Sequence, residues 1–255
     1  MKYTIVTYCS SGYRDCLLRT IPSWLADAQL DCVVSFKDTP HRLVPFLSER
    51  VLEITAFEPG EVEMGEHCCR KAAALRNYVQ NSGPGGDAHV ALLDCDCYLK
   101  RSLGPAFNHD FDVAVTLQSP GRAPLVSATT CGTKAAAMYN NPSAGAVFIR
   151  CNDHSRRFLT EWTSVQEVMT SFRQRRSRNR DQAALARACQ TLKGSIKLTA
   201  LNALLFNSYP DSAMHRDVVN WLGALQDRAP ATLMLHFAYG LWQNSEFVRD
   251  VCEIA

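Results

Sequence analysis

The stretch that decides the fold is His89-Val-Ala-Leu-Leu-Asp-Cys-Asp-Cys97. Its apolar residues run directly into Asp94, and Asp96 follows two positions later. A short apolar run that ends abruptly in acid is typical of a buried parallel strand whose carboxyl end opens on a crevice. Because ligands bind along that edge of open α/β sheets, we expect the two aspartates to lie where a ligand is bound.

The spacing of these aspartates indicates a metal site. Residues i and i+2 of an extended chain point to the same side, so Asp94 and Asp96 can converge on one hard cation. Carboxylate oxygens suit Mg²⁺ or Mn²⁺, which proteins often hold through one or two carboxylates and the phosphates of a substrate. Asp-x-Asp also occurs in solvated turns and helix caps, but the buried strand before it favours the metal.

The overall composition bounds the class of protein. The chain has 255 residues, 47% of them hydrophobic, and a net charge of +2. Such a length can bury a substantial core, and the near-balanced charge gives no global attraction to nucleic acid or membrane. No apolar run reaches the roughly 18 residues of a transmembrane helix, and the first residues lack a signal-peptide pattern, so we expect a cytoplasmic protein.

The eleven cysteines do not indicate a disulfide framework, because the number is odd, the chain is long and no export signal is visible. Cys68-Cys69 and Cys95-x-Cys97 also lack the paired Cys-x-x-Cys spacing of a zinc site. We expect reduced thiols. If strand geometry persists beyond Leu93, Cys95 and Cys97 face away from the aspartates and serve packing.

Strand and helix patterns alternate along the chain. Apolar runs predict strands, and apolar residues at helical spacing predict helices. The expected strands are 2–8, 32–36, 50–55, 89–93, 111–117, 144–150, one or two within 196–206, and 233–237; the expected helices are 13–28, 42–47, 66–80, 155–172 and 181–191. This alternation favours an α/β fold with a mostly parallel sheet flanked by helices. The segment 118–141 is expected to begin as a loop and to continue as an Ala-rich turn. The loop would cover the donor or receive the acceptor, although such segments are often merely irregular.

Four stretches, taken in order, resemble the GT-A glycosyltransferases, enzymes that use nucleotide-diphospho-sugars. They are similar to that superfamily's basic helix and Asp-x-Asp strand, its Asn-x-Gly strand, its Asp-Gln helix start and its late His-Phe-x-Gly segment. The stretches are Arg70-Lys-Ala-Ala-Ala-Leu-Arg-Asn77 with Leu92-Leu-Asp-Cys-Asp96, Asn141-Pro-Ser-Ala-Gly-Ala-Val-Phe-Ile-Arg150, Arg180-Asp-Gln-Ala-Ala-Leu185 and Leu235-His-Phe-Ala-Tyr-Gly-Leu-Trp242. The resemblance implies a Rossmann-like GT-A fold in a single domain, 1–255, whose first part (about 1–100) binds the nucleotide and whose second part (about 101–255) binds sugar and acceptor.

The resemblance also implies roles for individual residues. The metal, Mn²⁺ or Mg²⁺, would be bound by Asp94, Asp96 and His236, and the catalytic residues beside the reacting carbon would be Asp181 and Gln182. The donor, expected to be a UDP-sugar, would be held by Thr7, Tyr8 (stacked on the base), Ser11, Arg76, Asp94, Ser143 and Gly145.

These roles agree with the chemistry of the donor. A nucleoside diphosphate leaves readily only when its developing charge is neutralised, by a divalent cation and by cationic side chains. Arg76, or alternatively Arg70 or Lys71, would supply that charge. The structural alternatives are a core position for His236, a helix N-cap for Asp181 and a solvated helix face for Arg76.

An arginine-rich run suggests the acceptor. It contains Arg173, Arg175, Arg176, Arg178 and Arg180. Placed before the Asp-Gln helix, these side chains would bind a polyanion at the mouth of the site, such as hydroxymethylated DNA, a phosphorylated lipid or an acidic glycan. The near-neutral net charge argues against extensive wrapping by DNA, and such runs also occur as exposed loops.

The resemblance to retaining families favours retention of the anomeric configuration. An inverting enzyme needs a carboxylate base aligned with the acceptor hydroxyl, whereas a front-face displacement lets the leaving phosphate take the proton. One alternative is a nucleotidyltransferase or sugar-nucleotide pyrophosphorylase, although the loop Cys9-Ser-Ser-Gly-Tyr-Arg14 has only one of the glycines expected there. The other is a non-catalytic nucleotide-binding module, which would have no use for the complete set of acidic residues and His236.

Overall fold

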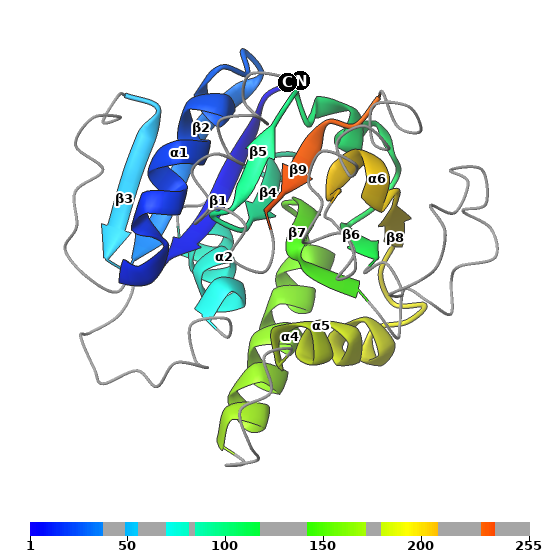
Figure 1. Cartoon of the computed structure of the whole chain (residues 1–255). Coiled ribbons are helices and arrows are strands. Elements are labelled where there is room, and N and C mark those ends of the chain that lie inside the picture. The colour runs from blue at the N-terminus through cyan, green and yellow to red at the C-terminus, as the bar shows by residue number, and fades with distance from the viewer. Residues whose placement is uncertain are drawn as a thin grey trace, which may run out of the picture.

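The computed structural model describes residues 1–37, 49–55, 70–81, 85–117, 142–171, 180–208 and 231–237. Its strands are β1 (Tyr3–Cys9), β2 (Leu30–Lys37), β3 (Val51–Thr55), β4 (His89–Leu93), β5 (Cys97–Leu99), β6 (Val113–Leu117), β7 (Pro142–Arg150), β8 (Leu198–Leu201) and β9 (Met234–His236). Its helices are α1 (Arg14–Leu25), α2 (Arg70–Asn81), α4 (Asp153–Ser171), α5 (Arg180–Thr191) and α6 (Ala203–Phe206), with 3-10 helices η1 (Ser11–Tyr13) and η4 (Gly104–Asn108) (Figure 1).

Seven strands form one sheet in the order β3-β2-β1-β4-β7-β6-β8. β1 is parallel to β2 and β4, β2 to β3, and β6 to β8, whereas β7 is antiparallel to both of its neighbours. The expected α/β fold with a mostly parallel sheet is therefore confirmed. Because β7 runs against β4, with Ala146 opposite Leu93, its first residues lie at the carboxyl end of β4.

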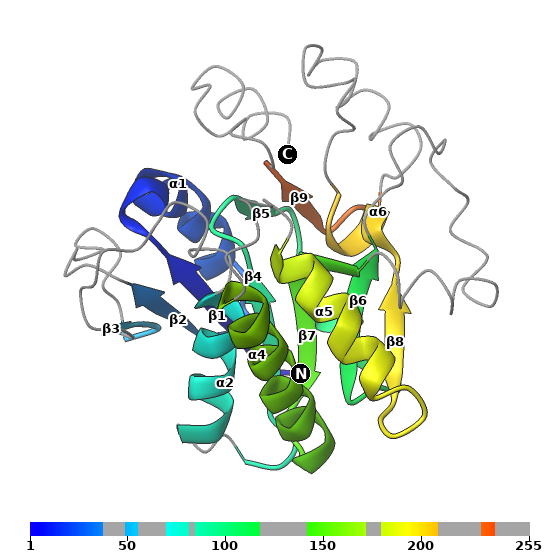
Figure 2. The ribbon, with the colours of Figure 1, turned by 90° about the horizontal axis from the view of Figure 1, so that it is seen from below.

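Two apolar cores cover the two faces of the sheet. Successive side chains of a strand point to opposite faces, and along β1 Ile5 packs with Leu17 of α1, whereas Val6 belongs to the core that contains Leu75 of α2 and Phe158 of α4. All of these side chains are fully buried, and burying each contributes about 1.5–3 kcal/mol. Figure 2 shows α2, α4 and α5 gathered on the same side.

A second, two-stranded sheet joins the late part of the chain to the turn after β4. β5 pairs antiparallel with β9, with Cys97 directly opposite His236. The backbone N–H of Phe237 also donates to the carbonyl of Asp96 over 2.8 Å. These backbone contacts fix the position of residue 236 beside residues 96 and 97, although about half the chain separates them.

Some expectations differ from the structure or fall outside it. The range 196–206 holds one strand, β8, followed by the short helix α6, because the apolar pattern there does not distinguish a short strand from a buried helical turn. The expected helix 42–47 and the expected loop 118–141 lie outside the described residues. In the described part of the chain, none of the helices combines the length and apolarity needed to cross a membrane.

Candidate functional site

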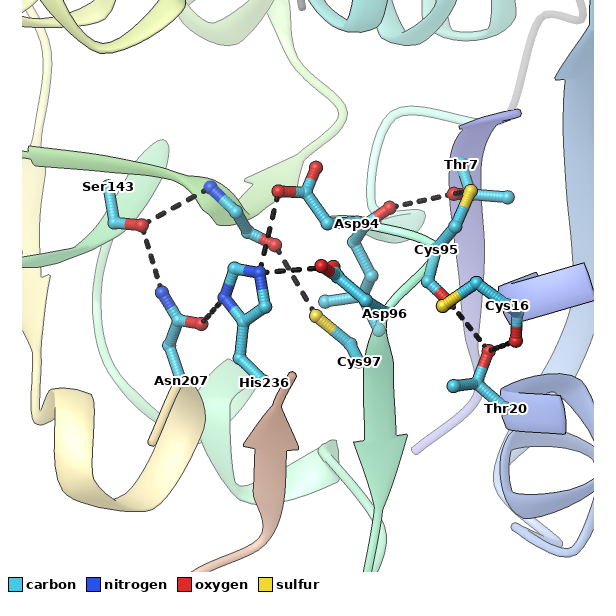
Figure 3. A network of polar contacts seen from close by, with 12 residues as sticks. Thr7, Cys16, Thr20, Asp94, Cys95, Asp96, Cys97, Ser143, Asn207 and His236 are labelled. Carbon is cyan, nitrogen blue, oxygen red and sulfur yellow. Dashed lines mark hydrogen bonds and ion pairs between the residues drawn. The ribbon is translucent and has the colours of Figure 1, made fainter. Parts of the chain in front are cut away.

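A turn at the carboxyl end of β4 builds the centre of the site. The N–H of Cys97 donates to the carbonyl of Asp94 over 3.1 Å, and the N–H of Asp94 donates to the carbonyl of Gly145 on β7, also over 3.1 Å. This turn folds Asp94 and Asp96 toward the same space, into which β9 projects His236 (Figure 3). The structure thus brings together the three residues expected to bind metal.

The two carboxylates converge on one imidazole. Nε2 of His236 lies 3.1 Å from Oδ1 of Asp96 and 3.7 Å from Oδ2 of Asp94. Asp96 and His236 are each 7% exposed. Although burial opposes their ionisation, their mutual attraction lowers the pKa of Asp96 and raises that of His236. Burial also raises the pKa of Asp94, with Asp96 adding to the effect and Lys71 opposing it.

Lys71 is the cation that reaches this group. Its Nζ lies 2.8 Å from Oδ1 of Asp94 and 2.9 Å from Oδ2 of Asp181, and the lysine is 8% exposed. Arg76, five residues along α2, instead donates from Nη1 to Oγ1 of Thr163 in α4, over 2.7 Å. Of Arg76 and its two alternatives, Arg70 and Lys71, it is thus Lys71 that contacts the carboxylates in the structure.

The residues expected at the sugar lie on the other side of Lys71. Asp181 is in the first turn of α5 and 3% exposed, and its Oδ1 accepts from the N–H of Gln182 over 2.9 Å. Asp181 is the second residue of α5 rather than its N-cap, and its second oxygen contacts Lys71. Oε1 of Gln182 is buried and has no hydrogen-bond partner among the described residues.

Gly145 makes room for the histidine. A Cβ atom added there would lie 2.5 Å from Cε1 of His236 and 3.2 Å from Oδ2 of Asp94, well inside van der Waals contact. The expectation that this glycine lies in the donor site is consistent with its place, but its immediate neighbours are the imidazole and the carboxylate.

Asn207 orients the histidine, and no sequence pattern predicts this role. Nδ1 of His236 lies 2.8 Å from Oδ1 of Asn207, whose Nδ2 donates to Oγ1 of Thr116 over 2.8 Å and to Oγ of Ser143 over 3.0 Å. With the amide nitrogen held by two hydroxyls, the amide oxygen accepts the Nδ1 proton, which turns Nε2 toward the aspartates. Ser143, expected to contact the donor sugar, is thus part of this support.

Cys97 corrects the prediction that it faces away from the aspartates. The turn ends the strand after Leu93. The side chain of Cys97, the first residue of β5, therefore lies on the same face as that of His236. Ligand atoms of Asp96, Cys97 and His236 all lie within 4.8 Å of one another. Cys95 behaves as expected: it is 4% exposed, and its Sγ contacts the carbonyl of Tyr8 at 3.2 Å.

Two of the residues expected to hold the nucleoside, Thr7 and Tyr8, are buried. Oγ1 of Thr7 donates to the carbonyl of Leu93 over 2.8 Å and the side chain is fully buried. Tyr8 is 6% exposed and belongs to an apolar core, so its ring presents no open face to a base. Ser11 begins η1, immediately after β1. These contacts favour a structural role for Thr7 and Tyr8.

The expected acceptor-binding residues lie outside the described residues. They are Arg173, Arg175, Arg176 and Arg178, which fall between α4 and α5. Their place in the chain sets them just before the helix that carries Asp181.

The donor atoms fit the divalent metal that the sequence resemblance implies. Two carboxylates and an imidazole, the preferred ligands of Mn²⁺ and related ions, meet within hydrogen-bonding or near-contact distance. Asp94 and Asp96 repel each other, which a bound cation would relieve, and the absence of a side chain at Gly145 keeps that space open.

Solved structures with the same fold are glycosyltransferases. The glycosyltransferase GlyE of Streptococcus pneumoniae TIGR4 is 13% identical, with a TM-score of 0.57 over 100% of this chain and 64% of GlyE. The galactosyltransferase LgtC, solved with donor and acceptor sugar analogues, is 12% identical, with a TM-score of 0.51 over 97% of this chain and 95% of LgtC. A glycosyltransferase involved in glycosylation of the major capsid of PBCV-1 is 10% identical, with a TM-score of 0.56 over 98% of this chain and all of that protein.

This chain spans 64% of the length of GlyE but nearly the full length of the other two. No protein-family model and no curated protein sequence matches it. At these identities the likeness concerns the fold, and it confirms the expected glycosyltransferase architecture.

Proposed function

We propose that the protein is a metal-dependent glycosyltransferase that moves a sugar from a nucleotide-diphospho-sugar, expected to be a UDP-sugar, to a hydroxyl acceptor. The observation that carries the proposal is the grouping of Asp94, Asp96 and His236 next to Lys71 and Asp181. It lies at the sheet edge where α/β folds bind ligands, in a fold shared with solved glycosyltransferases.

Asp94, Asp96 and His236 would hold the metal, Mn²⁺ or Mg²⁺. The ion would supply Lewis-acid neutralisation of the diphosphate. The chain's own part is to preorganise the ligands: Lys71 fixes one oxygen of Asp94 and leaves the other directed at His236, and Asn207 sets the imidazole. Preorganised groups of this kind avoid reorganisation as charge develops.

Lys71 also ties the metal-binding residues to the sugar-binding residues. Lys71 contacts Asp94 and Asp181 at the same time. A bound diphosphate would therefore lie near both the ammonium group of Lys71 and the metal. Oε1 of Gln182, buried without a partner among the described residues, would accept a hydroxyl of the transferred sugar. Such a bond would offset the cost of leaving this oxygen unsatisfied, about 1–3 kcal/mol.

We propose retention of configuration for the transfer. An inverting mechanism needs a carboxylate that can take the acceptor proton. Asp181 is 3% exposed, and its two oxygens already contact Lys71 and the N–H of Gln182, which favours a role in positioning. The acceptor proton would then pass to the leaving phosphate on the front face of the sugar.

We propose a polyanion as the acceptor, on the strength of the arginine-rich run before α5. Hydroxymethylated DNA is the first to try, followed by phosphorylated lipids and acidic glycans. Transfer to the true acceptor should collapse when Arg173, Arg175 and Arg176 are replaced by glutamine. Undiminished transfer to that acceptor would refute this part of the proposal.

The experiment that tests the donor site is thermal unfolding with UDP, GDP, CMP and TDP, each with and without Mn²⁺. A ligand at a hundredfold its Kd stabilises the folded state by about 2.7 kcal/mol. We expect one nucleotide, UDP, to raise the Tm only with Mn²⁺, and Asp96→Ala to abolish that shift. Asp110→Ala, a change at an exposed aspartate on the opposite edge of the sheet, is the matched control. Absence of any shift would contradict the proposal and favour a different ligand, and the anomer of the product, assigned by NMR, decides between retention and inversion.

A further inference from the structure

We propose that Cys97 is a fourth ligand in the centre formed by Asp94, Asp96 and His236, and that its thiol lets this centre also capture thiophilic divalent cations of the Zn²⁺ class, in competition with Mn²⁺ or Mg²⁺. The inference rests on the proposed metal centre and deepens it, because it concerns which metals that centre binds.

The place of Cys97 follows from strand pairing. It is the first residue of β5 and lies directly opposite His236 of β9. In an antiparallel pair, directly opposed side chains share one face, with their Cβ atoms about 4.5–5.5 Å apart. The thiol and the imidazole are therefore neighbours for a backbone reason, and a ligand atom of Asp96 lies within 4.8 Å of both (Figure 3).

The structural contacts of this thiol are weak. Its Sγ donates a long hydrogen bond to the carbonyl of Gly145, at 3.8 Å, and that carbonyl already accepts the N–H of Asp94 over 3.1 Å. Cys95, by comparison, contacts the carbonyl of Tyr8 at 3.2 Å on the side away from the histidine. Within the described residues, Cys97 is the cysteine that groups with an aspartate and a histidine as a set of metal ligands.

The ligand atoms of Asp96, Cys97 and His236 form a compact group, and Asp94 adjoins this group through His236. Zinc–ligand bonds of about 2.0–2.3 Å place the ligands of a tetrahedral site roughly 3.3–3.8 Å apart. Here the imidazole lies 3.1 Å from Asp96 and 3.7 Å from Asp94, and the thiol is within 4.8 Å of Asp96 and His236. Zinc bound by Asp96, Cys97 and His236 would bring these ligand atoms to the separations of a tetrahedral site.

The chemistry of the fourth ligand explains the capture of Zn²⁺. Soft thiolate ligands favour Zn²⁺, whereas carboxylate, carbonyl and water ligands suit Mg²⁺ and Mn²⁺. On binding, the S–H bond of Cys97 breaks, a sulfur–metal bond forms and the proton passes to solvent. Without the thiol, the remaining two carboxylates and one imidazole would still bind Mn²⁺.

The test uses the metal-free full chain without nucleotide, and Co²⁺ and Zn²⁺ as probes. Wild-type protein with Co²⁺ should show the near-ultraviolet charge-transfer absorption of a thiolate–cobalt bond, and Cys97→Ser should lose it. Its Zn²⁺ affinity should fall at least about tenfold, the lower end of the loss when a supporting partner of a ligand is removed, while its Mn²⁺ affinity changes little. Cys151→Ser, at another fully buried cysteine, is the matched control and should keep the wild-type spectrum and affinities.

Each of the other outcomes refutes a specific part of the proposal. An unchanged cobalt spectrum and Zn²⁺ affinity in Cys97→Ser would refute the thiol ligand, while loss of Mn²⁺ binding in Asp96→Ala would leave the proposed metal centre intact. If wild-type protein binds neither Zn²⁺ nor Mn²⁺, both the thiol ligand and the metal centre are refuted. Circular dichroism of each variant separates loss of a ligand from loss of the fold.

Discussion

The two edges of the sheet both bury an aspartate to the same extent, and they satisfy it in opposite ways. Asp96 at the carboxyl edge and Asp112 at the amino edge are each 7% exposed. One oxygen of Asp112 accepts from the backbone N–H of Lys197 over 2.8 Å, and the other accepts from Nδ2 of Asn152 over 2.7 Å. Asp96 instead shares an imidazole with a second carboxylate, that of Asp94.

This difference separates a structural carboxylate from a functional one. At the amino edge each oxygen has a donor of its own, fixed by the fold. At the carboxyl edge the charges of Asp94 and Asp96 face each other, and Asp96 helps to raise the pKa of Asp94. Two like charges held close together in a buried site cost stability unless a cation binds to them. The contacts at the carboxyl edge therefore support the ligand proposed there, whereas both oxygens of Asp112 already have donors within the protein.

The largest effect is expected from Lys71→Met. The change leaves Asp94 and Asp181 without the buried cation that both contact, and breaking a buried ion pair in this way costs about 3–5 kcal/mol. Equilibrium unfolding in urea measures the loss. The deficit should shrink as the pH falls, because the unpaired carboxylates then bind protons in the folded protein.

Lys197→Met is the control for that prediction. Lys197 pairs with Asp110 at the amino edge, where the two side chains are 65% and 76% exposed, so its loss should change stability little. Equal losses for the two variants would mean that the ion pairs at the two edges are equivalent, and the distinction between the edges would fail.

Gly145→Ala should weaken metal binding with less effect on stability. The added methyl group would lie 2.5 Å from Cε1 of His236, so the imidazole must turn from its place between Asp94 and Asp96. We expect the Mn²⁺ affinity to fall about 10–100-fold, as when a ligand loses its orientation. Gly86→Ala, where the added atom meets nothing within 4 Å, should bind Mn²⁺ as wild type does. Calorimetric titration measures both, and an unaffected Gly145→Ala variant would show that His236 is not a ligand.

Asn207 allows a finer test of the same histidine. Asn207→Leu removes the acceptor for Nδ1 and should lower Mn²⁺ affinity about tenfold. Asn207→Asp keeps an acceptor oxygen and should retain the affinity, with Thr116 and Ser143 donating to the new carboxylate. The ¹⁵N shifts of His236 report the tautomer directly. A leucine variant that keeps both the affinity and the Nδ1–H form would show that the amide is incidental.

The strands that carry the site could be predicted from local pattern. Apolar runs such as 89–93 and 144–150 predict that their residues are buried, and their alternation with helices predicts a parallel sheet. The direction of β7 and the helical turn α6 could not be predicted, because an apolar run specifies burial but not its partner. The same limit applies to 118–141 and 42–47, which lie outside the described residues.

Some residues of the site could be predicted from the sequence and others could not, for similar physical reasons. Asp94, Asp96 and His236 were found because residue type and order carry their chemistry. Lys71 and Arg76 lie on one helix, where five residues correspond to a rotation of about 140°, and only the packed structure shows which of the two reaches the carboxylates.

Two other residues depended on geometry that no local pattern reveals. Cys97 was misplaced because the turn between Asp94 and Cys97 ends the alternation that the prediction assumed. Asn207 is an uncharged residue after a short helix, and only its contacts with His236 and two hydroxyls reveal what it does.

The smallest effect is expected from Asp110→Asn, which tests the amino edge. Lys197 lowers the pKa of Asp110, and Asp110 raises that of Lys197. A carboxyl group whose pKa is lowered by folding adds stability above its unfolded pKa and loses it as the pH falls through the folded value; the lysine loses its share as the pH rises through its raised pKa. Thermal unfolding of wild type and variant should therefore differ slightly near neutral pH and converge in acid. Both groups are exposed, so high salt should also reduce the difference, since the screening length falls to about 3 Å at 1 M ionic strength, close to the 2.9 Å that separates Nζ of Lys197 from Oδ2 of Asp110. A difference in stability that survives acid and salt would mean that the amino edge depends on the charge of Asp110. If the difference disappears and Mn²⁺ binding is unchanged, the contrast between the amino edge and the ligand site proposed at the carboxyl edge holds.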